Sequence, residues 1–237
     1  MTLKHETVNR LYIALANAIA DYIEDIDMVS VCISKGNSKI GHVMNVSFAP
    51  YHTCGNACMN CECGVKCYDA KACLQYKNVL HARARNTALL FADRDRLFDD
   101  IDKAMSRRRK NKFLRWHVAG DIVDLDHFMR MVDNARRHPD FIIWTYTKQY
   151  SIINEYCKLY GRDSIPSNFS IMFSKWDRLP MHNPYNFPVF ACRNIDGNVD
   201  TSDDWFNSNF KCPGDCGECL KNGTGCPYAM SAWVDEH

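Results

Sequence analysis

The sequence predicts an α/β fold, which is either a partial (βα) barrel or a mostly parallel sheet with helices outside, plus a Cys-rich C-terminal appendage. Short apolar runs alternate with amphipathic runs in the second half of the chain, as in βα units. The 237 residues are 46% hydrophobic and 12% aromatic, enough for one substantial core. The segment after Arg193 is polar and lacks periodicity before its cysteines. We therefore expect a main domain at 1–195 with a Cys-rich loop at 51–68, and a metal-binding tail at 196–237.

The predicted elements are justified in chain order. Apolar residues at helical spacing predict a helix over 5–27, and the apolar runs at 29–34 and 42–50 predict strands. Good helix formers with almost no breakers predict one or two helices over 69–106. The βα series then predicts strands at 113–118, 141–147, 169–174 and 187–192, with helices at 125–138 and 152–160.

Charge and cysteine content narrow the function classes. The net charge of +1, from 29 Lys and Arg against 28 Asp and Glu, implies no polyanionic partner by itself. The charged N-terminus lacks a long apolar run, so we expect no secretory signal, no membrane span and a cytoplasmic protein. Because the cytosol keeps thiols reduced, the 13 cysteines are predicted to be metal ligands rather than disulfides.

Two cysteine clusters share the spacing C-x3-C-x2-C. Intervals of two or three residues let thiolates converge on one centre, and the intervening glycines relieve the tight backbone turns. Four cysteines suit either a [4Fe-4S] cluster or Zn; the first loop favours the cluster, and the second leaves both open. The alternative to metal binding is that these cysteines are small buried side chains with a structural role only. The candidate ligands are Cys54, Cys58, Cys61, Cys63 and Cys67, then Cys212, Cys216, Cys219 and Cys226.

A strand, a C-x3-C-x2-C loop and then a helix resemble the opening of radical S-adenosylmethionine enzymes. In those enzymes three cysteines hold a [4Fe-4S] cluster and leave one iron open to the methionine part of the cofactor. The resemblance implies that Cys54, Cys58 and Cys61 are the ligands. It also implies that Gly120 and Asp121 hold the cofactor's amino group, since glycine permits backbone approach and a carboxylate pairs with an ammonium. One glycine precedes an Asp here, where the usual pattern has two before a Glu.

Further motifs span about residues 35–175. They are KGNSKIG from Lys35, Thr53-Cys54, C-x3-CY-x-AK from Cys63, WHV-x-GDI from Trp116, and Thr147-Lys148. This set is similar to the gene product 88 family of phages and mobile elements, which places the protein in the host cytoplasm if it is phage-encoded. The family pattern emphasises the Cys-Tyr pair, which implies Cys63, Cys67 and Tyr68 alongside Cys54. The two resemblances therefore differ on the ligands, and both choose Cys54.

Polar residues at predicted strand ends are the remaining candidates. His117 is a candidate proton shuttle or substrate contact, with a hydrogen-bonded structural histidine as the alternative. Thr147 and Lys148 close the next strand and are candidates for cofactor or substrate contact, with Lys148 as an anion partner or a solvated lysine. A basic run suits nucleic-acid phosphates or a solvated helix end: Arg107, Arg108, Arg109 and Lys110.

The leading hypothesis is an enzyme resembling radical S-adenosylmethionine proteins and acting on an unknown substrate. It implies one or two [4Fe-4S] clusters, S-adenosylmethionine, and an electron donor such as flavodoxin or ferredoxin. The second cysteine loop would hold an auxiliary cluster or a Zn ion. The alternatives are a non-catalytic, metal-stabilised phage or mobile-element protein that binds nucleic acid, and an electron-transfer module.

Overall fold

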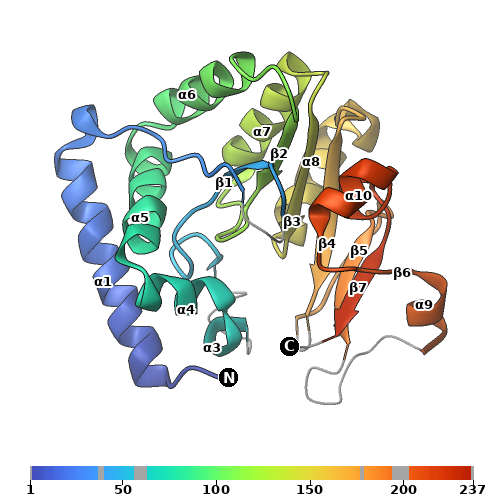
Figure 1. The fold of residues 1–237 in the computed structure, drawn as a ribbon, viewed down its shortest axis with the longest axis horizontal. Helices are drawn as coiled ribbons and strands as arrows, with labels where there is room; N and C mark the ends of the chain where they lie inside the picture. Colours follow the sequence, from blue (N-terminus) through green and yellow to red (C-terminus); the bar gives the residue numbers. More distant parts are fainter. Residues whose placement is uncertain (1, 37–39, 56–62, 177–178, 194–202, 236–237) are drawn as a thin grey trace.

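The protein is an α/β fold built on one parallel sheet, as the computed structural model shows (Figure 1). The structure describes residues 2–36, 40–55, 63–176, 179–193 and 203–235. The strand order is β1-β2-β3-β4-β5-β7-β6, and β1 and β6 lie at the two edges. A mostly parallel sheet is therefore the correct alternative of the two predicted. The strands are β1 (Met44–Val46), β2 (Phe113–Trp116), β3 (Ile142–Thr147), β4 (Phe169–Lys175), β5 (Val189–Arg193), β6 (Phe210–Lys211) and β7 (Ala232–Asp235).

The helices depart from the prediction mainly over residues 69–106. Three helices occupy this stretch instead of one or two, because Tyr76 and Asp93 leave the helical conformation. The Asp93 side chain accepts a hydrogen bond from the Arg96 amide and so caps the third helix. The helices are α1 (His5–Glu24), α3 (Cys63–Lys66), α4 (Tyr68–Gln75), α5 (Lys77–Ala92), α6 (Arg94–Ser106), α7 (Leu125–Arg137), α8 (Tyr150–Tyr160), α9 (Asp203–Ser208) and α10 (Cys216–Asn222), with short 3-10 turns η1 (Ile26–Met28), η2 (Arg162–Ser164) and η3 (Cys226–Tyr228).

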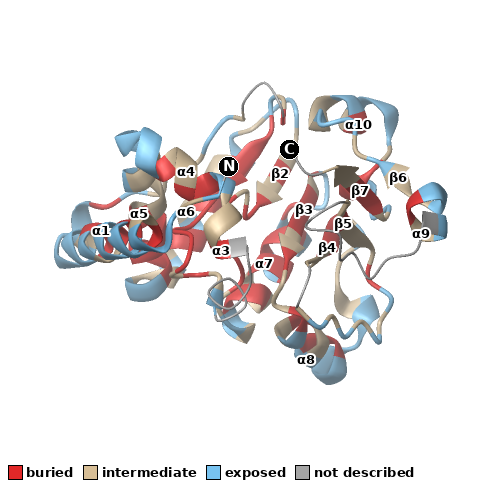
Figure 2. Cartoon of the chain, turned by 90° about the horizontal axis from the view of Figure 1, so that it is seen from below, coloured by how far each residue is buried: buried red, intermediate tan, exposed pale blue. Residues whose placement is uncertain are grey.

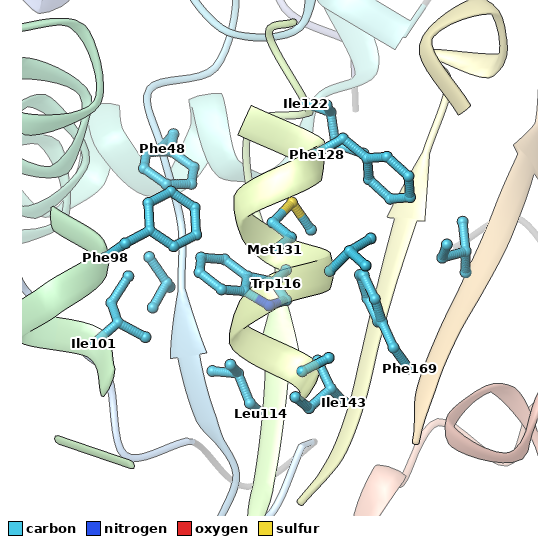
Figure 3. Close-up of a cluster of buried hydrophobic side chains, with 14 of the residues drawn as sticks. Phe48, Phe98, Ile101, Leu114, Trp116, Ile122, Phe128, Met131, Ile143 and Phe169 are labelled. Carbon is cyan, nitrogen blue, oxygen red and sulfur yellow. The ribbon is translucent and has the colours of Figure 1, made fainter. Parts of the chain in front are cut away.

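The main core fills one face of the sheet. Side chains alternate along β2, and Leu114 and Trp116 point to the face that α5 to α8 cover. They meet Phe128 and Met131 of α7 and Ile143 of β3 in one cluster (Figure 3). Burying each large apolar side chain contributes roughly 1.5 to 3 kcal/mol, so this cluster anchors the strands. Figure 2 shows the buried residues along the strands and the exposed ones on the outer helices.

The opposite face of the sheet is packed by the C-terminal segment. Trp144 of β3 and Met172 of β4 form a second cluster there with Cys226 of η3 and Ala232 of β7. The segment also inserts β7 beside β5 and adds β6 at the edge. The residues predicted as an appendage thus contribute two strands to the same sheet.

Two predicted strands near the N-terminus are shorter than expected or missing. Residues 29–34 form no strand and only one antiparallel bridge, from Ser34 to Asn45, so the predicted strand is wrong. The strand predicted at 42–50 is limited to Met44–Val46. Beyond it the Phe48 amide donates a hydrogen bond to the Ala119 carbonyl of a loop, at 3.0 Å.

Within the described residues, no helix combines the length and apolar composition needed to cross a bilayer.

Candidate functional site

The first cysteine loop lies where β1, β2 and β3 end, a region called here the carboxyl edge. The Thr53 hydroxyl donates to the Ala49 carbonyl (2.9 Å) and accepts from the Asp121 amide (3.3 Å). The Gln149 side chain, just after β3, donates to the Cys54 carbonyl at 2.8 Å. The segment carrying Cys54 is therefore fixed to the segments that follow β2 and β3. Ligands of open α/β sheets commonly bind at this edge.

Gly120 is required for the close contact between two loops. Its φ is +78°, and a Cβ there would lie 2.5 Å from the Thr53 hydroxyl oxygen and 2.9 Å from Phe48 Cβ. An alanine at this position would be strained and would collide with the loop after β1. The space beside Gly120 is thus filled by the chain itself, which explains this glycine without a ligand.

Asp121 ties the loop after β2 to the end of β3. Its Oδ1 accepts hydrogen bonds from the Thr147 hydroxyl (2.6 Å) and the Ile122 amide (2.8 Å), and its Oδ2 accepts from the Lys148 amide (2.8 Å). Burial raises the pKa of Asp121 to about 6, although these hydrogen bonds oppose the shift. Both carboxyl oxygens, predicted to meet a cofactor ammonium, are engaged within the chain.

His117 lies in a buried pair with His127. His117 has a φ of +53°, and its Nδ1 lies 3.0 Å from the Thr145 hydroxyl. The centres of the two imidazole rings are 5.3 Å apart. Neither Nε2 has a hydrogen-bond partner among the described residues. Burial lowers the pKa of His117 well below its ordinary value and that of His127 to about 3. Both imidazoles are therefore neutral near pH 7, and the contact with Thr145 matches the structural alternative for His117.

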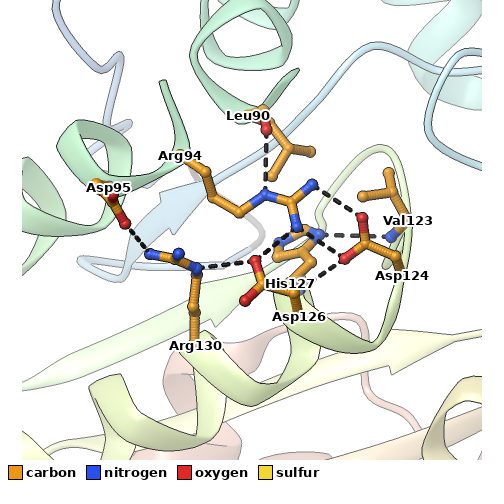
Figure 4. A network of polar contacts seen from close by, with 8 residues as sticks. All are labelled: Leu90, Arg94, Asp95, Val123, Asp124, Asp126, His127 and Arg130. Carbon is orange, nitrogen blue, oxygen red and sulfur yellow. Dashed lines mark hydrogen bonds and ion pairs between the residues drawn. The ribbon is translucent and has the colours of Figure 1, made fainter. Parts of the chain in front are cut away.

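A polar network fixes the start of α7 directly after the Gly120-Asp121 loop (Figure 4). Asp124 caps α7 by accepting from the His127 amide at 2.7 Å. The Arg94 guanidinium of α6 bridges Asp124 and Asp126, at 2.8 Å to each. The network therefore anchors the loop from its α7 side, as Asp121 does from its β3 side.

Lys148 and Trp176 extend the carboxyl edge toward β4. The Lys148 Nζ lies 5.3 Å from the centre of the Trp176 ring, within cation–π range. Thr147 also accepts from the Gln149 amide at 2.9 Å, so its hydroxyl donates to Asp121 and accepts from Gln149. Sequence reasoning missed Trp176 and Gln149, because nothing near them in the chain indicates which loop they contact.

The remaining ligands predicted in the first loop are only partly described. Cys58 and Cys61 lie outside the described residues, and of Cys63 only the backbone, which begins α3, is described. Cys67 precedes α4 and is half-buried, and Tyr68 is 58% exposed. No three His, Cys, Asp or Glu side chains within the described part of the chain are arranged to hold a metal ion. The choice between the two ligand sets stays a prediction.

The second cysteine segment lies on the sheet face opposite α5 to α8. Cys212 follows β6, Cys216 and Cys219 belong to α10, and Cys226 begins η3. Burial raises the pKa of the Cys219 thiol to about 11 and that of Cys226 to about 12, and the Cys212 and Cys216 thiols shift both in the same direction. The Cys216, Cys219 and Cys226 thiols therefore stay protonated near pH 7. Metal binding would have to displace those protons.

Arg115 is a further residue that sequence reasoning missed. Its guanidinium carbon lies 4.7 Å from the centre of the Tyr146 ring, on the face that carries the second cysteine segment. Burial raises the pKa of the Cys216 thiol, and the Arg115 charge opposes that shift. The available indication was a charged residue in a central parallel strand, where both faces are usually buried.

The comparisons with known proteins identify a family. No curated protein and no solved structure matches the chain. The family model described as gene product 88 matches residues 30–187, which include β1 to β4 and the whole carboxyl edge. The matched region is more than half of the 237 residues, and the chain therefore belongs to the gene product 88 family.

Proposed function

We propose that this protein is an iron–sulfur enzyme of the radical S-adenosylmethionine type, acting at the carboxyl edge on an unknown substrate. The observation that carries the proposal is the path of the first cysteine loop. It leaves the carboxyl end of β1 and is hydrogen-bonded through Thr53 and Gln149 to the segments that end β2 and β3. A parallel sheet presents loops from several strands at this edge, which suits a cofactor and a substrate held side by side.

The donor chemistry fits iron. Cys54 is a half-buried free thiol followed by Gly55, whose φ of +62° permits a tight turn. Cys54 would act with Cys58 and Cys61, or with Cys63 and Cys67. A bound cluster would supply the electron that cleaves the sulfonium of S-adenosylmethionine.

The chain's own residues would shape and position this site. Asp121 would act as a positioning residue, because it holds the Thr147 hydroxyl and the Lys148 amide in place. Lys148 would supply a cation for an anionic part of the substrate or cofactor, with its Nζ held beside the Trp176 ring.

The test is anaerobic purification followed by metal analysis and turnover. We expect a brown protein with about four irons per cluster, and 5′-deoxyadenosine after addition of dithionite and S-adenosylmethionine. Cys54→Ala should remove the first cluster and abolish product formation. Cys32→Ala removes a half-buried free thiol outside both cysteine clusters and should change neither property.

Two results would contradict the proposal. A colourless protein that holds zinc alone would favour the metal-stabilised binding protein instead. Equal iron content in Cys54→Ala and wild-type protein would refute Cys54 as a ligand.

A further inference from the structure

A basic pocket lies at the amino ends of β1 and β2, at the opposite end of the sheet from the first cysteine loop. Its volume is about 540 Å³, and it is an open pocket lined by the segment around Lys35, the start of β1 at Met44 and the loop between α6 and β2. Five cationic side chains line it, and they define the basic pocket: Lys35, Arg107, Arg108, Arg109 and Lys110. No Asp or Glu is among its lining residues.

Backbone pairing brings the two basic segments together. Ser34 and Asn45 exchange two backbone hydrogen bonds of 3.0 Å, which hold Lys35 next to the start of β1. Arg108 reaches across from the other segment, donating to the His42 carbonyl at 2.8 Å and to the Asn111 carbonyl at 3.1 Å. These acceptors orient the guanidinium without neutralising its charge. Specific hydrogen bonds therefore hold the two basic segments together, and the pocket is more than a run of basic residues adjacent in the sequence.

The five pocket cations differ from the ion-paired cations elsewhere in the molecule. Several cations outside the pocket pair with carboxylates, such as Arg83 with Asp69 at 2.9 Å and Arg94 with Asp124 at 2.8 Å. Within the described residues, none of the five pocket cations forms an ion pair. The dipole of α6 favours cations near Ser106 but does not account for Lys35, which comes from a separate segment. Such concentrated positive charge favours the binding of an anionic partner.

We propose that the basic pocket binds the backbone phosphates of a nucleic-acid strand. Guanidinium groups match phosphate oxygens through paired hydrogen bonds. Four of the cations, Lys35, Arg107, Arg109 and Lys110, are exposed, so a nucleic-acid strand can reach them. No aromatic residue lines the pocket, so bases have nothing to stack on. Binding is thus independent of base sequence and strongly dependent on salt.

The experiment measures binding of a fluorescent oligothymidylate of about 20 nucleotides by anisotropy. With four phosphate contacts, affinity should fall about 50-fold between about 50 and about 200 mM NaCl. The double variant Arg107→Gln, Lys110→Gln should weaken binding at least about 10-fold and reduce the salt slope by about 1.4. The control Arg10→Gln, Lys158→Gln removes the same two charge types from exposed helix positions elsewhere and should bind like wild type.

Each result bears directly on the proposal. An equal loss of oligonucleotide affinity in both double variants would mean that net charge alone attracts the nucleic acid, which would contradict the proposal. If the wild-type protein does not bind the oligonucleotide, the proposal is wrong. If ATP or tripolyphosphate binds the pocket and the oligonucleotide does not, the site takes a small phosphorylated ligand and the strand assignment is wrong. Iron content is measured in the same samples, and it should be equal in all of them because the pocket is remote from Cys54.

Discussion

The two cysteine segments share one spacing but occupy different places in the fold. The first follows β1 to the carboxyl edge, where hydrogen bonds from Gln149 and Asp121 hold its described part. The second crosses the opposite face of the sheet, where Cys226 packs with Trp144 and Met172 as part of a core cluster. Equal spacing thus predicts similar metal chemistry. The positions differ, however: the described part of the first segment lies at strand ends, and the second segment packs against one face of the sheet. We therefore predict that the first segment serves the proposed reaction and that the second contributes mainly to stability.

The largest expected difference concerns two glycines of nearly equal φ, one at the carboxyl edge and one in the second segment. Gly120→Ala should lower the free energy of unfolding by about 4 kcal/mol, from backbone strain plus collision with Thr53 and Phe48. Gly214→Ala, at φ +77° with no atom within 4 Å of the added Cβ, should lose only about 1 kcal/mol. Urea unfolding measures both. Equal losses would contradict the tight loop packing at the carboxyl edge.

The next difference is a pH dependence at the carboxyl edge. The folded pKa of Asp121, about 6, lies above its ordinary value of 3.8, so folding favours the protonated carboxyl. Its contribution to stability is full well below the unfolded pKa of 3.8 and is lost as the pH rises through 6, a total change of about 3 kcal/mol. Asp121→Asn cannot ionise, so the difference in unfolding free energy between it and wild type should shift by about 2.4 kcal/mol between pH 4 and 7.

Asp215→Asn is the control for replacing an aspartate with asparagine. Asp215 is exposed and caps α10 in the second segment, and an asparagine retains an acceptor at that position. Its unfolding free energy should therefore stay within about 0.5 kcal/mol of wild type. A difference for Asp121→Asn that does not change between pH 4 and 7 would contradict the shifted carboxyl.

The smallest expected effect is a difference in stability between serine variants of the two cysteine segments, measured in metal-free protein. Cys226→Ser places a hydroxyl within an apolar cluster and should lower the unfolding free energy by about 2 kcal/mol. Cys54→Ser changes a half-buried residue and should stay within about 0.5 kcal/mol of wild type. Chemical denaturation in the presence of a chelator checks both. A larger loss in Cys54→Ser would reverse the roles assigned to the two segments.

The amino-acid sequence by itself determined the fold class and most elements of the sheet. Apolar runs and helical periodicity report local burial, and they predicted β2 to β5 and the helices between them to within a few residues. The spacing of the cysteines and the motifs around Gly120 also pointed to the carboxyl edge and to the family. These features are local, so a single sequence can carry them.

Only the tertiary structure decided which residues act together. The contacts of Asp121 with Thr147 and of Gln149 with Cys54 join residues 26 and 95 positions apart. The insertion of β7 beside β5 and the meeting of Lys35 with Arg108 depend in the same way on the path of the whole chain. Local periodicity records whether a side chain is buried, but its partner is set by packing between distant segments. For that reason the intrachain contacts of Gly120 and Asp121, which hold two loops together, came from the structure alone, and their contact with a cofactor stays a prediction.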